Sequence, residues 1–130
     1  MLVSHDTDPA TNHPSGVAIV QLNRKATLNS LTPAVGTALE KLLRMLPDDK
    51  RVRALVITGS GRAFSAGGDY DWLGERSRDT IASNRRIMRE FYNNYLVLRS
   101  MPFPVISAVN GHAVGAGLCL AMASDVRCAV

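Results

Sequence analysis

The sequence contains little cysteine: two residues in 130, Cys119 and Cys128, with no CxxC pair. Together with three histidines they do not form the spaced clusters that hold zinc, so no metal site is expected. Sparse, unpaired cysteine is typical of reduced intracellular proteins. The compartment stays open between the cytoplasm and the mitochondrial or peroxisomal matrix, because the first residues carry no legible targeting signal.

Aromatic residues and long apolar runs are also scarce. Aromatic residues make up 5% of the chain, which argues against the base-stacking surfaces of nucleic-acid-binding proteins. No apolar run approaches the roughly 18 residues that a membrane span needs. Neither nucleic acid nor a membrane is therefore an expected partner. The 15 basic residues exceed the 11 acidic ones, and the formal charge of +4 favours an anionic small molecule as the ligand.

The chain alternates strand patterns with helix patterns. Residues 1–15 are polar and are expected to form a flexible lead-in, whereas residues 16–130 are expected to fold as one unit. Apolar runs rich in β-branched residues predict the strands, at 17–22, 52–58, 105–109 and 126–130. Helical spacing predicts the helices, at 33–46, 69–73, 80–99 and 115–123. On the helix at 80–99 one apolar stripe is expected, formed by Ile81, Met88, Phe91, Tyr95 and Leu98. Strands separated by helices predict an α/β fold with a largely parallel sheet.

Two glycine-bearing turns carry the strongest chemical signal. One spans 64–69 and the other 110–117, and each follows a predicted buried strand and precedes a predicted helix. Glycine allows the backbone to approach another group closely, and the amides at a helix start are unpaired and attract negative charge. Two such amides that converge on one oxygen form an oxyanion hole.

Other interpretations of these segments have weaker support. The second turn matches two glycines of a dinucleotide-binding fingerprint, but Leu120 stands in place of the third. Ser65 lies in a motif one residue short of a nucleophile elbow and is interpreted as a small residue in a crowded turn. His112 is expected to make a local hydrogen bond. Cys119 could be activated by the helix dipole, although a buried small hydrophobe is the favoured interpretation.

In order and spacing, several segments resemble the crotonase (enoyl-CoA hydratase/isomerase) superfamily. They are LNR at 22–24, LNSL at 28–31, VITG at 56–59, AFSAGGD at 63–69, PV at 104–105, AVNGHAVGAG at 108–117 and SDVR at 124–127. The resemblance implies the ClpP/crotonase fold, a spiral of β-β-α units, of which this chain would be the N-terminal half. It also implies a homotrimer or hexamer for the full-length protein.

The same resemblance implies roles for particular residues. The thioester carbonyl of an acyl-CoA would rest between the backbone amides of Gly68 and Ala116, which are the catalytic groups. Coenzyme A would enter as part of the substrate, and no permanently bound cofactor is expected. The implied substrate-binding residues are Arg24, Ala26, Ala66, Gly67, Gly68, Asp69, Gly115 and Ala116.

The implied activity is enolate-stabilising acyl-CoA chemistry of the isomerase or hydratase kind, within fatty-acid metabolism. Family hydratases place one glutamate where Cys119 stands here, three residues after Ala116, and a second one further along than Val130. An isomerase that uses a single carboxylate therefore fits better than a two-glutamate hydratase. The alternative is a non-catalytic acyl-CoA-binding subunit. The 130 residues alone are expected to be inactive, because no carboxylate is placed to move the proton.

Overall fold

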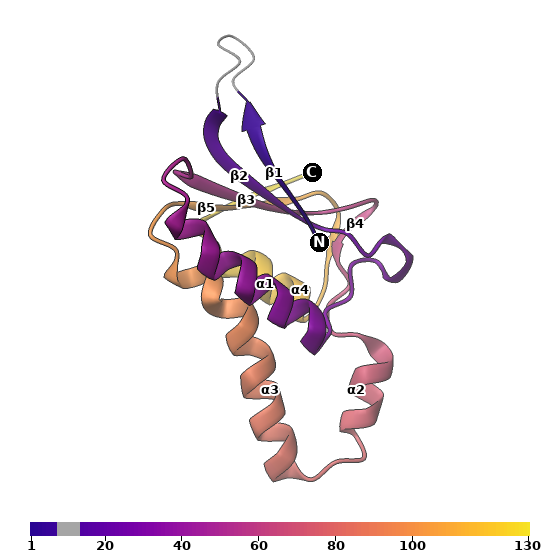
Figure 1. Ribbon diagram of the computed structural model, residues 1–130. Helices are drawn as coiled ribbons and strands as arrows, with labels where there is room; N and C mark the ends of the chain where they lie inside the picture. The colour runs from indigo at the N-terminus through magenta and orange to yellow at the C-terminus, as the bar shows by residue number, and fades with distance from the viewer. Residues whose placement is uncertain (8–13) are drawn as a thin grey trace.

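The computed structural model describes residues 1–7 and 14–130, and its largest element is a five-stranded sheet (Figure 1). The strands lie in the order β1-β2-β3-β5-β7, and all neighbours are parallel except β1 and β2. Their bounds are β1 Leu2–Thr7, β2 Pro14–Leu22, β3 Ala54–Gly59, β5 Val105–Val109 and β7 Val126–Ala129. A second sheet pairs two short strands in parallel, β4 Ala63–Ser65 and β6 His112–Ala113. The predicted α/β class with largely parallel pairing is confirmed.

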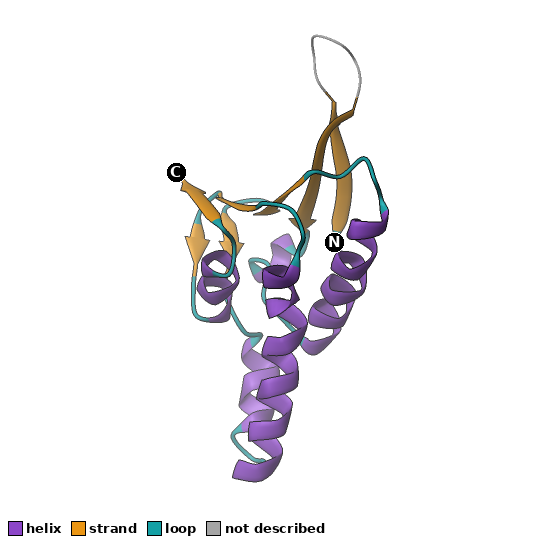
Figure 2. Cartoon of the chain, turned by 90° about the vertical axis from the view of Figure 1, so that its left-hand side faces the viewer, coloured by secondary structure: helices purple, strands orange, loops and turns teal. Residues whose placement is uncertain are grey.

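The helices lie on one side of the main sheet. Figures 1 and 2 show α1 and α4 next to the sheet, while α3 extends away from it and α2 runs beside α3. The helix bounds are α1 Pro33–Met45, α2 Tyr70–Arg76, α3 Ile81–Leu96 and α4 Ala116–Met122, with 3₁₀ turns at Lys25–Thr27, Leu46–Asp48 and Val97–Ser100. Within the described part of the chain, every helix is too short or too polar to cross a lipid bilayer.

Helix starts are fixed by local chemistry. Thr32, Asp69 and Thr80 precede α1, α2 and α3, and the side-chain oxygen of each accepts a hydrogen bond from the backbone amide three residues later. These bonds satisfy amides that have no partner inside the helix. Pro33 occupies the first position of α1, where its missing N–H costs nothing.

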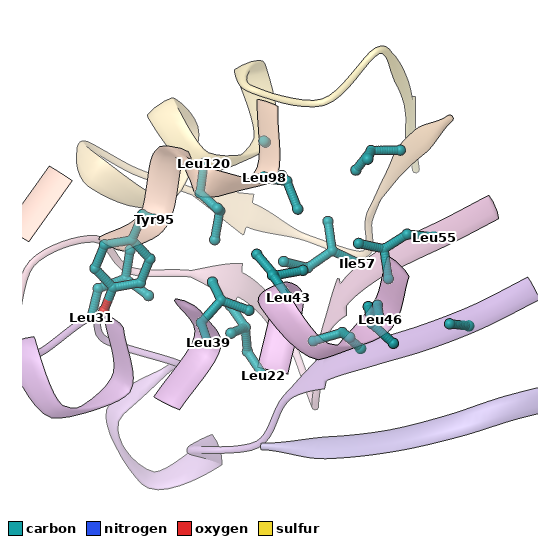
Figure 3. Close-up of a cluster of buried hydrophobic side chains, with 14 of the residues drawn as sticks. Leu22, Leu31, Leu39, Leu43, Leu46, Leu55, Ile57, Tyr95, Leu98 and Leu120 are labelled. Atoms are coloured by element: carbon teal, nitrogen blue, oxygen red, sulfur yellow. The ribbon is translucent and has the colours of Figure 1, made fainter. Parts of the chain in front are cut away.

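The hydrophobic core lies between the main sheet and the helices. Residues of β3 alternate between buried and half-buried, which directs Leu55 and Ile57 into the core. Leu39 and Leu43 of α1 belong to the same buried cluster, as does Leu120 of α4 (Figure 3). The core therefore packs α4, the helix that follows the second glycine turn, directly onto the sheet.

Two expectations differ from the structure outside the site. The polar lead-in expected over residues 1–15 contains strand β1, in which Val3 pairs with Val20 of β2 and His5 pairs with Ala18. Residues 8–13 of that lead-in lie outside the described residues. Strand β1 is exposed along its whole length, so its sequence shows no alternation of buried and exposed residues. Pairing with β2 holds β1 at the edge of the sheet. Ile81, expected in the apolar stripe of the helix at 80–99, is 83% exposed because that end of α3 projects from the core.

Candidate active site at two glycine turns

The short second sheet brings the two glycine turns together. Ala63 pairs with His112 and Ser65 pairs with Ala113, and the amide of Val114 donates a hydrogen bond to Ser65 O at 3.0 Å. Both turns leave this sheet in the same direction, because β4 and β6 are parallel. The turn after β4 therefore lies against the turn after β6.

The contact between the turns requires glycine at two positions. Gly67 has φ of +89°, and a methyl group added there would lie 2.5 Å from Val114 O. A methyl group added at Gly117 would lie 2.6 Å from Cβ of Ser65 and 2.7 Å from Ser65 O. Such separations are well inside van der Waals contact, so any larger residue would push the two turns apart.

The hydrogen bonds around the first turn leave the Gly68 amide unpaired. Leu31 N donates to Gly67 O at 2.7 Å, and Asp69 N donates to Leu31 O at 2.9 Å. Successive amides of an extended segment point to opposite sides. The Gly68 N–H therefore points away from Leu31, and it donates to no residue in the described part of the chain.

The second turn leaves the Ala116 amide unpaired in the same way. Ala116 is the first residue of α4. The next two amides, those of Gly117 and Leu118, donate to Val114 O, and the Cys119 amide donates to Gly115 O. Ala116 N donates to none of the described residues. An unpaired amide at a helix start carries part of the positive end of the helix dipole.

Both unpaired amides belong to residues that line one cleft of about 340 Å³. The lining residues are Ala66, Gly67, Gly68, Leu73, Met88, Phe91, Tyr92, Val114, Gly115 and Ala116. The structure thus brings together five of the predicted site residues from the two turns. The remaining wall consists of side chains from α2 and α3 together with Val114. Two hydrogen-bond donors beside an apolar wall can stabilise an oxygen that becomes negatively charged.

Three predicted site residues lie outside this cleft. Nη1 of Arg24 donates to Ser30 O at 2.7 Å and to Ser30 Oγ at 3.1 Å. Ser30 Oγ in turn donates to Oδ2 of Asp69 at 2.9 Å. Arg24 lines a separate pocket of about 200 Å³ between the end of β2 and α1. Ala26 is exposed on the 3₁₀ turn that follows Arg24.

Asp69 holds the first turn and caps α2. Its carboxylate accepts the Ser30 hydroxyl and the Trp72 amide, and these two hydrogen bonds, the first being the larger cause, lower the pKa of Asp69 below its usual value. A nearby positive charge on Arg24 acts in the same direction. Asp69 is therefore ionised at neutral pH and fully engaged, which suits a structural role rather than proton transfer.

Two asparagines whose role the sequence did not indicate, Asn29 and Asn110, shape the first turn. Asn29 is 1% exposed, and its Nδ2 donates to Ser60 O at 2.9 Å and to Ala63 O at 2.8 Å. Oδ1 of Asn110 accepts from Gly59 N at 3.0 Å. Asn29 has φ of +57°, a conformation that asparagine tolerates better than most residues. Asparagine is favoured at loop positions with positive φ, so an asparagine in the loop that leads into a predicted helix is the signal that could have identified Asn29.

The alternative nucleophiles do not come together in a catalytic arrangement. Ser65 is fully buried, with Oγ donating to Asn29 O at 2.8 Å, as expected for a small residue in a crowded turn. The local hydrogen bond expected for His112 is not formed, because its side chain is exposed and bonds to none of the described residues. The prediction that Cys119 is buried is wrong, because this face of α4 is uncovered and Cys119 is exposed. Over the described ranges, no three metal-ligating side chains gather in one place.

Comparison with known proteins shows the family of the chain. A sequence model described as enoyl-CoA hydratase/isomerase matches residues 12–130. The chain belongs to this family. It is 40% identical over 119 residues to "probable enoyl-CoA hydratase EchA12" of Mycobacterium tuberculosis, a match that covers 87% of this chain and 41% of that protein. It is 39% identical over 115 residues to 1,2-epoxyphenylacetyl-CoA isomerase of Escherichia coli, covering 85% and 43%.

Solved structures of this enoyl-CoA hydratase/isomerase family share the fold. A monofunctional enoyl-CoA isomerase from M. smegmatis superposes with a TM-score of 0.71 at 40% identity, covering 98% of this chain and 49% of that one. An enoyl-CoA hydratase from Bacillus anthracis gives a TM-score of 0.79 at 31% identity, covering 98% and 46%. The chain spans less than half the length of these relatives, and it corresponds to the N-terminal half of a crotonase-fold protein. The fold implied by the sequence resemblance is confirmed.

Proposed function

We propose that this chain forms the oxyanion-stabilising part of an enzyme that processes acyl-CoA thioesters. The observation that supports this most directly is the pair of unpaired amides, Gly68 N and Ala116 N, on residues that line one cleft. The thioester oxygen of the substrate would accept both hydrogen bonds. Removing a proton from the α-carbon places negative charge on that oxygen, and each donor stabilises the charge by about 3 kcal/mol as it develops.

The coenzyme A portion of the substrate would lie along the outer side of the first turn. The backbone of Ala66–Asp69 would flank its adenine end, and the Arg24–Ala26 segment would lie beside its phosphates. Nη1 of Arg24 is held by Ser30, whereas Nη2 and Nε of Arg24 bond to none of the described residues. These two nitrogens would donate hydrogen bonds to a phosphate, and an anionic substrate also fits the net positive charge of the chain.

Proton transfer requires a group that the described part of the cleft does not supply. None of the ten lining residues is aspartate or glutamate. Cys119, which stands where family hydratases have a glutamate, cannot serve as a matched acid and base for adding water. We therefore propose isomerase-type chemistry with a single carboxylate supplied by another part of the full-length protein, and no activity for the 130 residues alone.

A second candidate function is favoured by the same absence. A cleft that presents two amides but no described carboxylate could bind an acyl-CoA thioester without turning it over. Such a non-catalytic subunit would retain affinity for substrate while lacking any acid or base. The two candidates differ in turnover, not in binding.

Turnover of 2-enoyl-CoA and 3-enoyl-CoA by the full-length protein, followed spectrophotometrically, tests the proposal. Ala116→Pro removes one donor at the first position of α4, where proline is tolerated. We expect a loss in kcat of about 10²–10³-fold, with Tm and circular dichroism showing that the fold remains. Ala116→Gly keeps the amide and should keep the activity.

Each outcome of this assay has a distinct meaning. Unchanged kcat in a folded Ala116→Pro variant would contradict the oxyanion assignment. Binding of acyl-CoA by the wild-type protein without turnover of either substrate would support the non-catalytic subunit. Absence of both binding and turnover would overturn the proposed function altogether.

A further inference from the structure

The part of the cleft beyond the two amides is almost entirely apolar. Its wall is built from Leu73 of α2, from Met88, Phe91 and Tyr92 of α3, and from Val114 of the second turn. Among the ten described lining residues, Tyr92 is the one whose side chain can donate a hydrogen bond. An acyl chain whose thioester oxygen bonds to the amides would extend along this wall.

The ring of Tyr92 is held by aromatic packing. It meets Phe91 edge-on, with ring centroids 5.3 Å apart and an interplanar angle of 87°. Phe91 in turn stacks on Trp72 of α2 with centroids 4.7 Å apart. Such contacts fix the position of an aromatic side chain and therefore of its hydroxyl.

The hydroxyl of Tyr92 differs from that of Tyr95, one turn further along the same helix. Tyr95 is buried, and its hydroxyl donates to Thr32 O at 2.8 Å. Burial raises the pKa of Tyr95 well above its usual value. Tyr92 is half-buried, and its hydroxyl bonds to none of the described residues. Tyr95 thus serves the fold, whereas Tyr92 lines the cleft and has a hydroxyl without a partner among the described residues.

We infer that Tyr92 determines substrate specificity, its hydroxyl pairing with an oxygen substituent on the acyl chain. A bound acyl group would remove water from this hydroxyl, and a plain hydrocarbon chain would leave it unpaired at a cost. A hydroxyl, carbonyl or ether oxygen on the chain would restore the hydrogen bond. The inferred substrate class is therefore oxygen-substituted acyl-CoA thioesters, an inference that rests on the proposed function of the cleft.

Calorimetric titration of the full-length protein with hexanoyl-CoA, 3-hydroxyhexanoyl-CoA and 6-hydroxyhexanoyl-CoA tests this inference. Each of the two hydroxylated ligands differs from hexanoyl-CoA by a single hydroxyl group, placed near the thioester in one and at the end of the chain in the other. The wild-type protein should bind at least one hydroxylated ligand about tenfold or more tightly than hexanoyl-CoA. Tyr92→Phe should abolish this preference while binding hexanoyl-CoA as tightly as the wild type or more tightly.

Tyr95→Phe is the matched control, because it removes a hydroxyl from the same helix outside the cleft. It should lower Tm and leave the ligand preference intact. An equal preference in the wild type and in Tyr92→Phe, or no preference in the wild type, would overturn the inference while leaving the proposed function standing. Failure of all three ligands to bind, with no turnover of enoyl-CoA, would instead overturn the proposed function.

Discussion

Replacing Gly67 with alanine tests how closely the two glycine turns approach. The added methyl group would lie 2.5 Å from Val114 O and 3.4 Å from Ala116 N. Val114 O accepts the amide of Gly117 at 2.8 Å and that of Leu118 at 3.4 Å, so it cannot move without disturbing the start of α4. The substitution should therefore affect both stability and the position of the Ala116 amide.

The expected cost combines two physical effects. An alanine at a positive φ is strained by about 1–2 kcal/mol, and forcing a methyl group into a filled space costs about 1–3 kcal/mol. Together Gly67→Ala should lower the free energy of unfolding by about 2–5 kcal/mol. A domain is stable by only about 5–15 kcal/mol, so the variant should remain folded but with a clearly lower urea midpoint.

Two further glycine variants separate backbone strain from the steric overlap of the added methyl group. Gly61→Ala also places alanine at positive φ, +77°, but its nearest atom is Cγ of Lys25 at an ordinary 3.5 Å. It should cost about 1–2 kcal/mol from strain alone. Gly74→Ala, inside α2 with nothing within 4 Å, should be neutral or stabilise by up to about 1 kcal/mol.

Urea denaturation of the full-length variants gives the free energies, and acyl-CoA titration reports on the cleft. Gly67→Ala should weaken acyl-CoA binding, while Gly61→Ala and Gly74→Ala should bind as the wild type does. If Gly67→Ala costs no more than Gly61→Ala, the close approach of the two turns is refuted. If it destabilises as expected but binds acyl-CoA normally, the link between this contact and the site fails.

Other substitutions test the groups that support the turns. Asn29→Asp replaces the donor to two carbonyls by a carboxyl group and should lower the free energy of unfolding by about 2–4 kcal/mol in urea denaturation. Burial raises the pKa of the new carboxyl in the folded state, so the loss of stability relative to the wild type should grow as pH rises from 4 to 7. A loss that does not change with pH would contradict this burial. Asp69→Ala removes a helix cap and should lower the free energy of unfolding by about 0.5–2 kcal/mol. The folded-state pKa of Asp69 is lowered from 3.8, so the stability difference from the wild type should be complete above about pH 4 and should shrink as pH falls below that. A stability difference that stays constant with pH would refute an ionised cap. Leu43→Ala, in the core that packs against the main sheet, should lower the free energy of unfolding by about 2–5 kcal/mol. The affinity for acyl-CoA should stay unchanged at temperatures where the variant is folded. A loss of affinity in the folded variant would instead show that the core sets the geometry of the site.

Much of the fold could be predicted because its elements carry local signals. Strands β3 and β5 are short apolar runs bounded by turn residues, and α1 has a threonine cap, a proline and a regular leucine spacing. Strand β1 could not be predicted, since all its residues are exposed and only its pairing with β2 defines it. An exposed edge strand has no periodic burial for a sequence to display.

The turns of the candidate site were predictable for the same reason, but its wall was not. Glycine spacing at Gly67, Gly68 and Gly115 reports backbone conformation directly, because those residue types are needed wherever a backbone must turn or approach closely. Phe91 and Tyr92 gave no comparable signal. Aromatic residues on an amphipathic helix have the same spacing whether they fill a core or line a cleft, and only the position of α2 against α3 distinguishes the two.

The two asparagines explain why glycine alone does not make the site. Glycine permits the positive φ of the first turn but does not hold it, since the same freedom is available to the unfolded chain. Asn29 binds Ser60 O and Ala63 O, and Asn110 binds the amide of Gly59, so both ends of the loop before the turn are fixed from different parts of the chain. A buried amide that lost one of these partners would be costly to leave unpaired. The amide of Gly68 can therefore stay unpaired because the segment that carries it is held by other bonds. The proposed oxyanion hole requires such a donor, one that is in position before negative charge develops on the ligand.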